Sequence, residues 1–328
     1  MPQTHFEVAL YYQFVDVEDP EALAASQRTL CQSLGLLGRI IIASEGINGT
    51  LSGTTDAIAQ YRAAMYTDRR FATMPFKLET STAHKFRRLS VRVKEEIVVM
   101  RSPVPLNPAQ TTGEHLSPKD FLQELRQGDA LIIDGRNDYE FDLGHFAGAL
   151  RPDVRYFREF PEWLDSHLPD DRSARILTYC TGGIRCEKLT SFLIEKGYEN
   201  VAQLDGGIIR YAQDPSTQGE GFVGKCYVFD QRMAVTVNPA DSQIVGRCHH
   251  CAAPCDRHRN CAYDPCHLQY LCCESCEVVH RGFCSTDCAS RAGRGSRDSG
   301  AVAVGGGGVV GGRVVGGRVV GGRVVGGG

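Results

Sequence analysis

The fold of this chain is decided by one stretch, Leu177-Thr178-Tyr179-Cys180-Thr181-Gly182-Gly183-Ile184-Arg185-Cys186. The apolar run before Cys180 predicts a buried strand, which places the cysteine at the carboxyl end of that strand, where open α/β sheets bind their ligands. The two glycines allow a tight loop whose backbone N–H groups point at the sulfur. The helix that follows and Arg185 favour a thiolate. Cys180 is therefore predicted to be a nucleophile rather than a core cysteine.

Short apolar strands alternate with helices on both sides of this stretch. Helices are predicted over Ser117–Gln127, Phe157–His167 and about Cys186–Lys196, and strands over Ala130–Asp134, Ile176–Tyr179 and Val201–Leu204. Short apolar strands separated by helices are typical of a parallel sheet. Because three prolines mark a linker around residue 105, we assign residues 103–222 to one α/β domain.

The preceding residues predict a different, α+β domain over 1–102. Strand and helix signals follow the order βαββαβ, with helices over Glu21–Leu34 and Thr55–Met65 and a last strand-like run over Leu89–Met100. This order predicts a ferredoxin-like, acylphosphatase-like sandwich.

Positive charge is concentrated in one part of this first domain. Residues 69–94 hold eight Lys or Arg against one acidic side chain. Such a stretch is what phosphate binding needs, and Phe86, between the bases, could stack on a nucleobase. Basic side chains that protect a strand edge from pairing are an equal alternative. The candidate contacts are Lys85, Arg87, Arg88 and Arg92.

Ten of the 14 cysteines lie between Cys248 and Cys288, in a predicted third part over 223–288. Four pairs have metal-ligand spacing, which indicates two zinc sites; an iron–sulfur cluster or disulfides are the alternatives. An alternating arrangement would join Cys248 and Cys251 with Cys273 and Cys276 in one site. It would join Cys261 and Cys266 with Cys284 and Cys288 in the other. The candidate ligands are Cys248, Cys251, Cys261, Cys266, Cys273, Cys276, Cys284 and Cys288.

Composition excludes a collagen, an acidic disordered chain and a uniformly disulfide-stapled mini-protein. The net charge of −3 combines an acidic body with a basic tail from residue 289, rich in glycine and in Gly-Gly-Arg-Val-Val repeats, which we expect to be disordered. The amino terminus has no signal-peptide pattern, and no apolar run is long enough to span a membrane. We therefore expect a cytoplasmic protein whose cysteines bind metal.

The Cys180 loop resembles that of rhodanese domains, in which an Arg or Thr follows the cysteine by five positions. Cysteine phosphatases have one residue more. Together with three further stretches, the loop resembles the tRNA uridine-34 hydroxylase family over residues 6–288. The further stretches are Ser44–Thr50, Val228–Arg232 and Asn260–Ala262.

This resemblance implies an enzyme that hydroxylates the wobble uridine in the anticodon loop of tRNA to 5-hydroxyuridine, with molecular oxygen as co-substrate. It implies Cys180 as the active cysteine, in a loop of Thr181, Gly182, Gly183 and Ile184, and it favours tRNA contact by the basic stretch. The sequence has no Rossmann Gly-x-Gly-x-x-Gly motif for a flavin or nicotinamide, that is, none placed between a predicted strand and a predicted helix.

Several functions and mechanisms stay open at this point. The Cys180 thiolate could add to C6 of uracil, with Arg185 and backbone amides stabilising the enolate, or it could carry a persulfide. A thiosulfate or persulfide sulfurtransferase and a non-catalytic, zinc-stabilised tRNA adaptor are the alternative functions. Cys186 could act as a resolving thiol, or it could simply be a packing residue of the core. The sequence says nothing about the oligomeric state.

Overall fold

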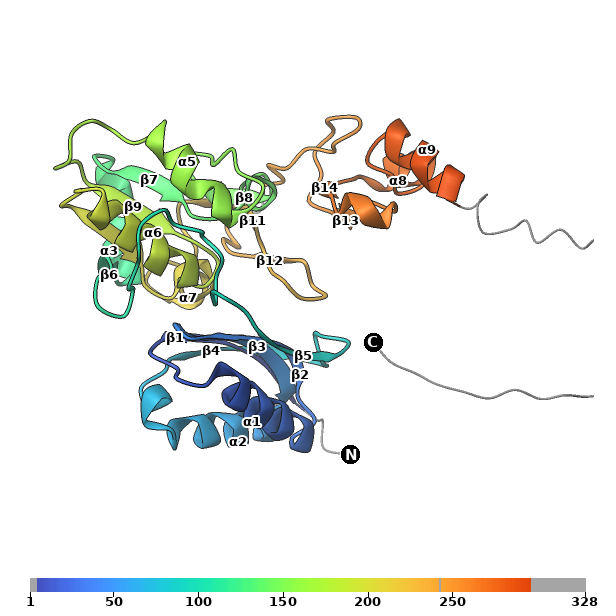
Figure 1. The fold of residues 1–328 in the computed structure, drawn as a ribbon. Coiled ribbons are helices and arrows are strands. Elements are labelled where there is room, and N and C mark those ends of the chain that lie inside the picture. The colour runs from blue at the N-terminus through green and yellow to red at the C-terminus, as the bar shows by residue number, and fades with distance from the viewer. Residues whose placement is uncertain (1–4, 242, 296–328) are drawn as a thin grey trace, which may run out of the picture.

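The first part of the chain is a five-stranded sheet with two helices on one face (Figure 1). The structure, a computed structural model, describes residues 5–241 and 243–295. Helices α1 (Pro20–Ser33) and α2 (Thr55–Tyr66) cover the sheet, whose strand order is β4-β1-β3-β2-β5. The strands are β1 (Phe6–Phe14), β2 (Leu37–Ala43), β3 (Gly46–Thr54), β4 (Phe76–Ser81) and β5 (Leu89–Val93). The order 4-1-3-2 confirms the predicted ferredoxin-like sandwich, to which β5 adds an edge strand.

Strand β1 has a different role on each of its faces. Ala9 and Tyr11 are fully buried in the core beneath the two helices. Because successive strand residues point to opposite faces, Leu10 and Tyr12 lie on the uncovered face of the sheet. That face packs against the Cys180 loop of the second part.

The strand predicted over Leu89–Met100 is too long, because β5 ends at Val93. The Glu96 carboxylate accepts a hydrogen bond from the backbone N–H of Met100 at 3.0 Å, which holds an irregular turn. Ile97 and Met100 are fully buried: Ile97 packs with Phe14 of β1 and Ala43 of β2, and Met100 packs with residues of the second domain. The apolar run therefore serves packing between the two domains rather than strand pairing.

The second part contains a parallel sheet of order β6-β10-β9-β7, which confirms the predicted α/β class. Its strands are β6 (Glu114–Leu116), β7 (Leu131–Asp134), β9 (Ile176–Tyr179) and β10 (Val201–Leu204). The helices are α3 (Pro118–Gln127), α4 (Asp138–Phe141), α5 (Phe160–Asp165), α6 (Ile184–Glu195) and α7 (Gly207–Gln213). As predicted, Ser117 caps α3, accepting a hydrogen bond from the Asp120 N–H. Strand β9 lies inside the sheet, so Cys180 follows an interior strand.

A small antiparallel sheet joins the second part to the third. Strand β11 (Phe222–Tyr227) pairs with β8 (Gly144–Phe146) on one side and with β12 (Ala234–Thr236) on the other. The segment 223–288 thus begins with strands that belong to a sheet of the second part, and the cysteine-rich module follows them.

The cysteine-rich module has little regular structure. It contains the hairpin β13 (His258–Asn260) and β14 (Gln269–Leu271), then α8 (Glu274–His280) and α9 (Thr286–Gly295). Helix α9 continues to Gly295, so the predicted disorder from residue 289 is wrong for its first seven residues; residues 296–328 lie outside the described part. Among the described helices, none has both the length and the apolar character needed to cross a bilayer.

Candidate active site

Cys180 lies between the carboxyl end of β9 and the amino end of α6, and it is fully buried. The backbone N–H of Gly183 donates a hydrogen bond to its Sγ at 3.1 Å, and the N–H groups of Gly182 and Arg185 also point at the sulfur. Gly183 has a φ of 100°, in the left-handed region that favours glycine, which lets the chain turn around the sulfur. The glycines thus form a cradle for an anion.

The cradle sets the charge of Cys180. Burial by itself would raise the pKa of this thiol, but a hydrogen bond from Cys186, the charge of Arg185 and the backbone N–H groups together hold the pKa well below the usual range. Burial and the adjacent Cys180 raise the pKa of Cys186. At neutral pH, therefore, Cys180 is a thiolate and Cys186 is a thiol that supports it.

Arg185 is held by a buried ion pair. Its two terminal nitrogens donate to the Glu140 carboxylate at 2.6 and 2.9 Å, and one of them also donates to Thr181 Oγ1 at 3.2 Å. Glu140 is fully buried, and burial would raise its pKa, but the Arg185 charge and hydrogen bonds lower it. Arg185 therefore acts on Cys180 through its charge and through the loop, since three of its five N–H donors are already engaged with Glu140 and Thr181.

Replacing Glu140 by glutamine is expected to destabilise the second domain by about 3–5 kcal/mol, because a buried guanidinium would lose its counter-charge. Urea unfolding followed by fluorescence of Trp163, the one tryptophan, in the core of this domain, measures the change. The control is Glu220→Gln, which breaks an exposed pair with Arg126 and should cost about 0–1 kcal/mol. Equal losses in the two variants would show that the Glu140–Arg185 pair does not hold the loop.

The first domain closes the Cys180 loop from the other side. Lys77 Nζ, from β4, donates to the carbonyl oxygen of Gly182 at 2.8 Å, and the Tyr12 hydroxyl, from β1, donates to Glu187 Oε1 at 2.8 Å. A Cβ atom on Gly182 would lie 2.6 Å from Cδ2 of Leu10, so a larger residue here would have to displace the end of the Leu10 side chain. In the sequence Lys77 is only one cation of the basic stretch, and no local pattern signals its contact with the loop.

A second contact between the domains joins two of the sequence stretches that carry the family resemblance. Lys188, in the first turns of α6, is almost fully buried and binds Glu45 Oε1 at 2.8 Å and Glu96 Oε2 at 2.6 Å. Glu45 belongs to the stretch Ser44–Thr50 of the first domain. These ion pairs hold the Cys180 loop against the face of the first sheet that α1 and α2 leave free.

A small cleft leads from the surface toward the loop. Phe229 at its mouth is 45% exposed, and the Arg185 guanidinium lies 5.8 Å from the centre of its ring. Both domains and the β11–β12 connection contribute to the lining, which comprises Val8, Leu10, Thr50, Lys77, Glu79, Thr181, Ile209, Val228, Phe229, Asp230 and Arg232. The stretch Val228–Arg232 therefore lies beside Cys180 in space.

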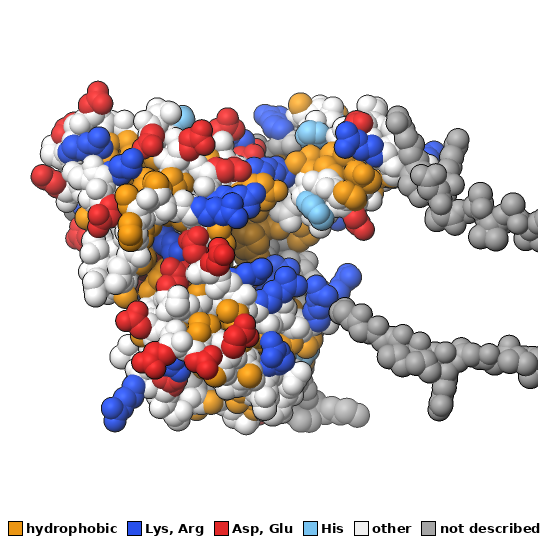
Figure 2. Space-filling view, viewed as in Figure 1, with side chains coloured by type: hydrophobic (Ala, Val, Ile, Leu, Met, Phe, Trp, Pro, Cys, Tyr) orange, Lys and Arg blue, Asp and Glu red, His pale blue; other side chains and the backbone are white. Residues whose placement is uncertain are grey.

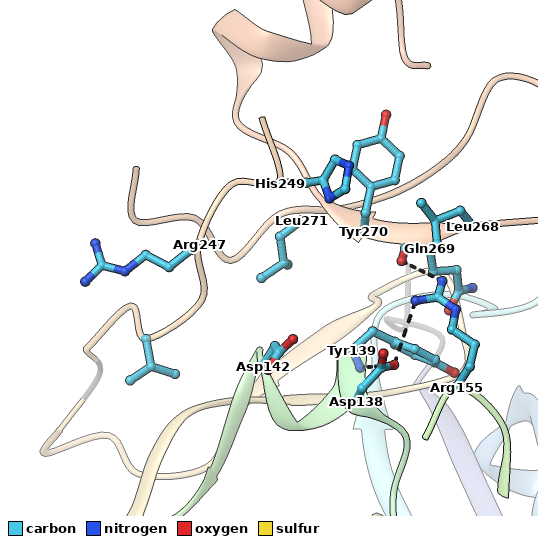
Figure 3. A pocket seen from close by; sticks show the side chains of 11 residues that line it. Asp138, Tyr139, Asp142, Arg155, Arg247, His249, Leu268, Gln269, Tyr270 and Leu271 are labelled. Atoms are coloured by element: carbon cyan, nitrogen blue, oxygen red, sulfur yellow. Dashed lines mark hydrogen bonds and ion pairs between the residues drawn. The ribbon is translucent and has the colours of Figure 1, made fainter. Parts of the chain in front are cut away.

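A larger cavity of about 440 Å³ lies elsewhere, between the second domain and the cysteine-rich module (Figure 3). Arg155 crosses it, donating to the Gln269 carbonyl oxygen at 2.9 Å and lying 3.7 Å from Asp138. Tyr139 and Tyr270 line opposite sides. The Cys180 loop contributes none of its lining residues, so we place the chemistry at the smaller cleft.

The candidate tRNA contacts lie in the first domain, three in the segment before β5 and Arg92 on β5 itself. Arg87, Arg88 and Arg92 are exposed and Lys85 is half-buried. Within the described residues, none of the four makes an ion pair. The Lys85 carbonyl oxygen accepts a hydrogen bond from the Gln231 N–H, which ties this loop to the stretch beside the cleft. In Figure 2, Lys and Arg side chains gather on this side of the first domain, below the hollow between the domains.

The structure brings the eight candidate metal ligands together as two sets of four. In each set the sulfur atoms lie within 4.8 Å of one another, and the sets alternate along the chain as the spacing suggests. One set is Cys248, Cys251, Cys273 and Cys276, and the other is Cys261, Cys266, Cys284 and Cys288. Four thiolates at this spacing fit a closed tetrahedral zinc site. Cys255 and Cys272, also buried, belong to neither set.

A cradled cysteine at the carboxyl end of an interior parallel strand, with an arginine five positions later, defines a rhodanese-like domain. Family models match the three parts in turn: a UPF0176 acylphosphatase-like domain over residues 6–97, a rhodanese-like domain over 117–214 and a rhodanese carboxyl-terminal region over 223–289.

Relatives of this chain give the family. A tRNA uridine(34) hydroxylase of Bacillus velezensis is 46% identical over 286 residues, covering 87% of this chain and 89% of that protein. One of Bacillus mycoides is 47% identical over 283 residues, covering 86% and 89%. The chain therefore belongs to the tRNA uridine(34) hydroxylase family. Among solved structures, a rhodanese-like domain protein from Staphylococcus aureus is 20% identical, with a TM-score of 0.26, and covers 30% of this chain and 90% of that chain.

Proposed function

We propose that this protein hydroxylates uridine 34 of tRNA at C5, with Cys180 as the nucleophile and molecular oxygen as co-substrate. The observation that carries the proposal is the buried Cys180 thiolate next to Thr181, which lines a cleft, in a chain whose relatives are named for this reaction. The direct test is to incubate the protein with unmodified tRNA and an external reductant, in air and under nitrogen, and to analyse the nucleosides. The proposal expects 5-hydroxyuridine in air only; its absence in air contradicts the proposal.

The proposed chemistry uses the thiolate to make C5 of uracil electron-rich. The sulfur forms a bond to C6, and the electrons of the C5–C6 double bond move toward the C4 carbonyl oxygen. C5 then takes one oxygen atom, loses its proton, and the thiolate leaves to restore the double bond. With molecular oxygen as oxidant, the second oxygen atom leaves as water, which requires two electrons and two protons from an external reductant.

The substrate has to bring a single base into the cleft. Because Cys180 is fully buried, the uracil must enter beside Thr181 and displace side chains that cover the loop. Bases in a single-stranded anticodon loop can be splayed out at small cost, which suits such a site. The free arginines near the cleft mouth would bind the flanking phosphates.

We assign zinc to the two cysteine sets as a structural metal. Each set offers four sulfur donors and no open position, which distinguishes structural from catalytic zinc sites. The sets would hold the two ends of the cysteine-rich module together in place of a hydrophobic core.

The tRNA-binding proposal predicts a strong salt effect at two arginines. The double substitution Arg87→Ala/Arg88→Ala is expected to weaken tRNA binding about tenfold or more. If each guanidinium neutralises one phosphate, the plot of the logarithm of the tRNA association constant against the logarithm of the salt concentration becomes shallower by about 1.4. Titrations at several salt concentrations measure both. The control is Arg126→Ala/Arg172→Ala, two exposed arginines near the amino ends of the parallel strands, opposite Cys180. An unchanged slope in the first variant, or an equal change in both, contradicts the assignment.

A further inference from the structure

Lys77 is a cation at the domain junction that the proposed chemistry has not yet used. Its other cationic neighbours at the junction are satisfied: Lys188 pairs with Glu45 and Glu96, Arg232 with Glu79 and Asp230, and Arg185 with Glu140. Within the described residues, Lys77 has no carboxylate partner. Its ammonium group donates to the Gly182 carbonyl oxygen at 2.8 Å and lies 4.7 Å from the centre of the Tyr12 ring.

Lys77 contacts the Cys180 loop and also lines the cleft. It lines the cleft together with Thr181, the residue next to Cys180, and with the aromatic Phe229. An ammonium group has three donors, and a single hydrogen bond of Lys77, to Gly182, is present. Two donors therefore remain for a group that enters the cleft.

We propose that this cleft receives the uracil ring and that the Lys77 ammonium binds the C4 carbonyl oxygen, the atom that becomes negative when Cys180 adds to C6. This assignment rests on the proposed function and names the group that stabilises its intermediate. The S–C6 bond forms as the C5–C6 π electrons shift to the C4 oxygen, so the negative charge moves from sulfur to an oxygen beside Lys77. When the thiolate leaves, the charge returns to sulfur, and Lys77 keeps its proton.

Lys77 suits this role better than Arg185, which the sequence alone suggested. Three of the five N–H donors of Arg185 bind Glu140 and Thr181, and its charge is paired with Glu140, whereas Lys77 has no carboxylate partner within the described residues. Preorganised donors at a developing oxyanion contribute most when they are desolvated and otherwise uncommitted, and losing one costs about 100- to 1,000-fold in rate.

The surroundings of Lys77 give this role a pH signature. Burial lowers the pKa of its ammonium to about 8, while the charges of Cys180, Asp205 and Glu187 raise the pKa and that of Arg210 lowers it. The ammonium also lies over the face of the Tyr12 ring. The role requires the protonated form, so activity should be retained below this value and lost as the pH rises through it. Arginine, which stays protonated, should move that loss to higher pH.

The test compares wild type, Lys77→Met and Lys77→Arg in single-turnover formation of 5-hydroxyuridine. Lys77→Met is expected to lose about 100-fold or more in rate while its tRNA affinity and thermal midpoint stay unchanged. Lys77→Arg is expected to keep more activity than Lys77→Met and to lose it at higher pH than wild type. The control is Lys119→Met, an exposed lysine on α3, which should match wild type.

Three results would overturn the assignment. The first is a Lys77→Met rate within about threefold of wild type, and the second is a loss of rate that parallels a loss of tRNA affinity or of thermal stability. The third is a loss of activity at high pH that occurs at the same pH in Lys77→Arg as in wild type. The proposed function is judged separately, because it fails only if the wild-type protein makes no 5-hydroxyuridine.

Discussion

Cys180→Ala is expected to abolish formation of 5-hydroxyuridine, with a loss of more than about 1,000-fold, because removing a covalent nucleophile leaves only binding and electrostatic effects. The measurement is nucleoside mass spectrometry of tRNA after incubation with each variant. tRNA affinity and metal content should not change, since Cys180 lies outside the basic stretch and both metal sets. The control is Cys31→Ala, a buried thiol in the core of the first domain whose pKa burial raises to about 12.

The same variant separates the alternative functions. Unchanged nucleosides together with a loss of thiosulfate:cyanide activity would select a sulfurtransferase. No change in either activity would favour a tRNA-binding adaptor. Both outcomes contradict the hydroxylase assignment when the wild-type protein, given the same reductant, forms 5-hydroxyuridine.

Cys251→Ser is expected to lower the zinc content from two ions to one per chain and to unfold the module around the first set. Structural zinc contributes about 10–16 kcal/mol in small metal-dependent modules, which is more than their remaining contacts supply. Metal analysis and hydrogen exchange over residues 246–288 measure the two effects. The control is Cys255→Ser, which removes a buried thiol outside both sets. Two zinc ions in Cys251→Ser, equal metal loss in the two variants, or bound iron in the wild type would contradict the assignment.

The local parts of the site could be predicted from the sequence. The Cys180 loop combines a buried strand, two glycines and a helix start within ten residues, so short-range rules are sufficient. Spacing also identifies the four cysteine pairs, because the two members of each pair are close in the chain; which pairs combine is set by the fold, and the structure has the alternating arrangement.

The partners from distant parts of the chain could not be predicted. Glu140 meets Arg185 across 45 residues, and Lys77 meets Gly182 across 105 residues and a domain boundary. The Glu140–Arg185 pair depends on the tertiary fold of the second domain, and the Lys77–Gly182 contact depends on how the two domains dock; no local pattern encodes either. Docking also explains the overlong strand prediction at Leu89–Met100: Ile97 is a β-branched residue that favours strands, but it lies beyond the end of β5 and packs with Phe14 and Ala43 at the domain junction.

The most direct test of the central claim is a search for a bond between Cys180 and the base. The protein is incubated with tRNA that carries 5-fluorouridine at position 34, and the digested complex is analysed by mass spectrometry. Fluorine at C5 cannot leave as a proton does, so the thiolate adduct should accumulate on the peptide that contains Cys180 and be absent in Cys180→Ala. A Cys180 peptide that carries one additional sulfur atom and no nucleotide would contradict the account.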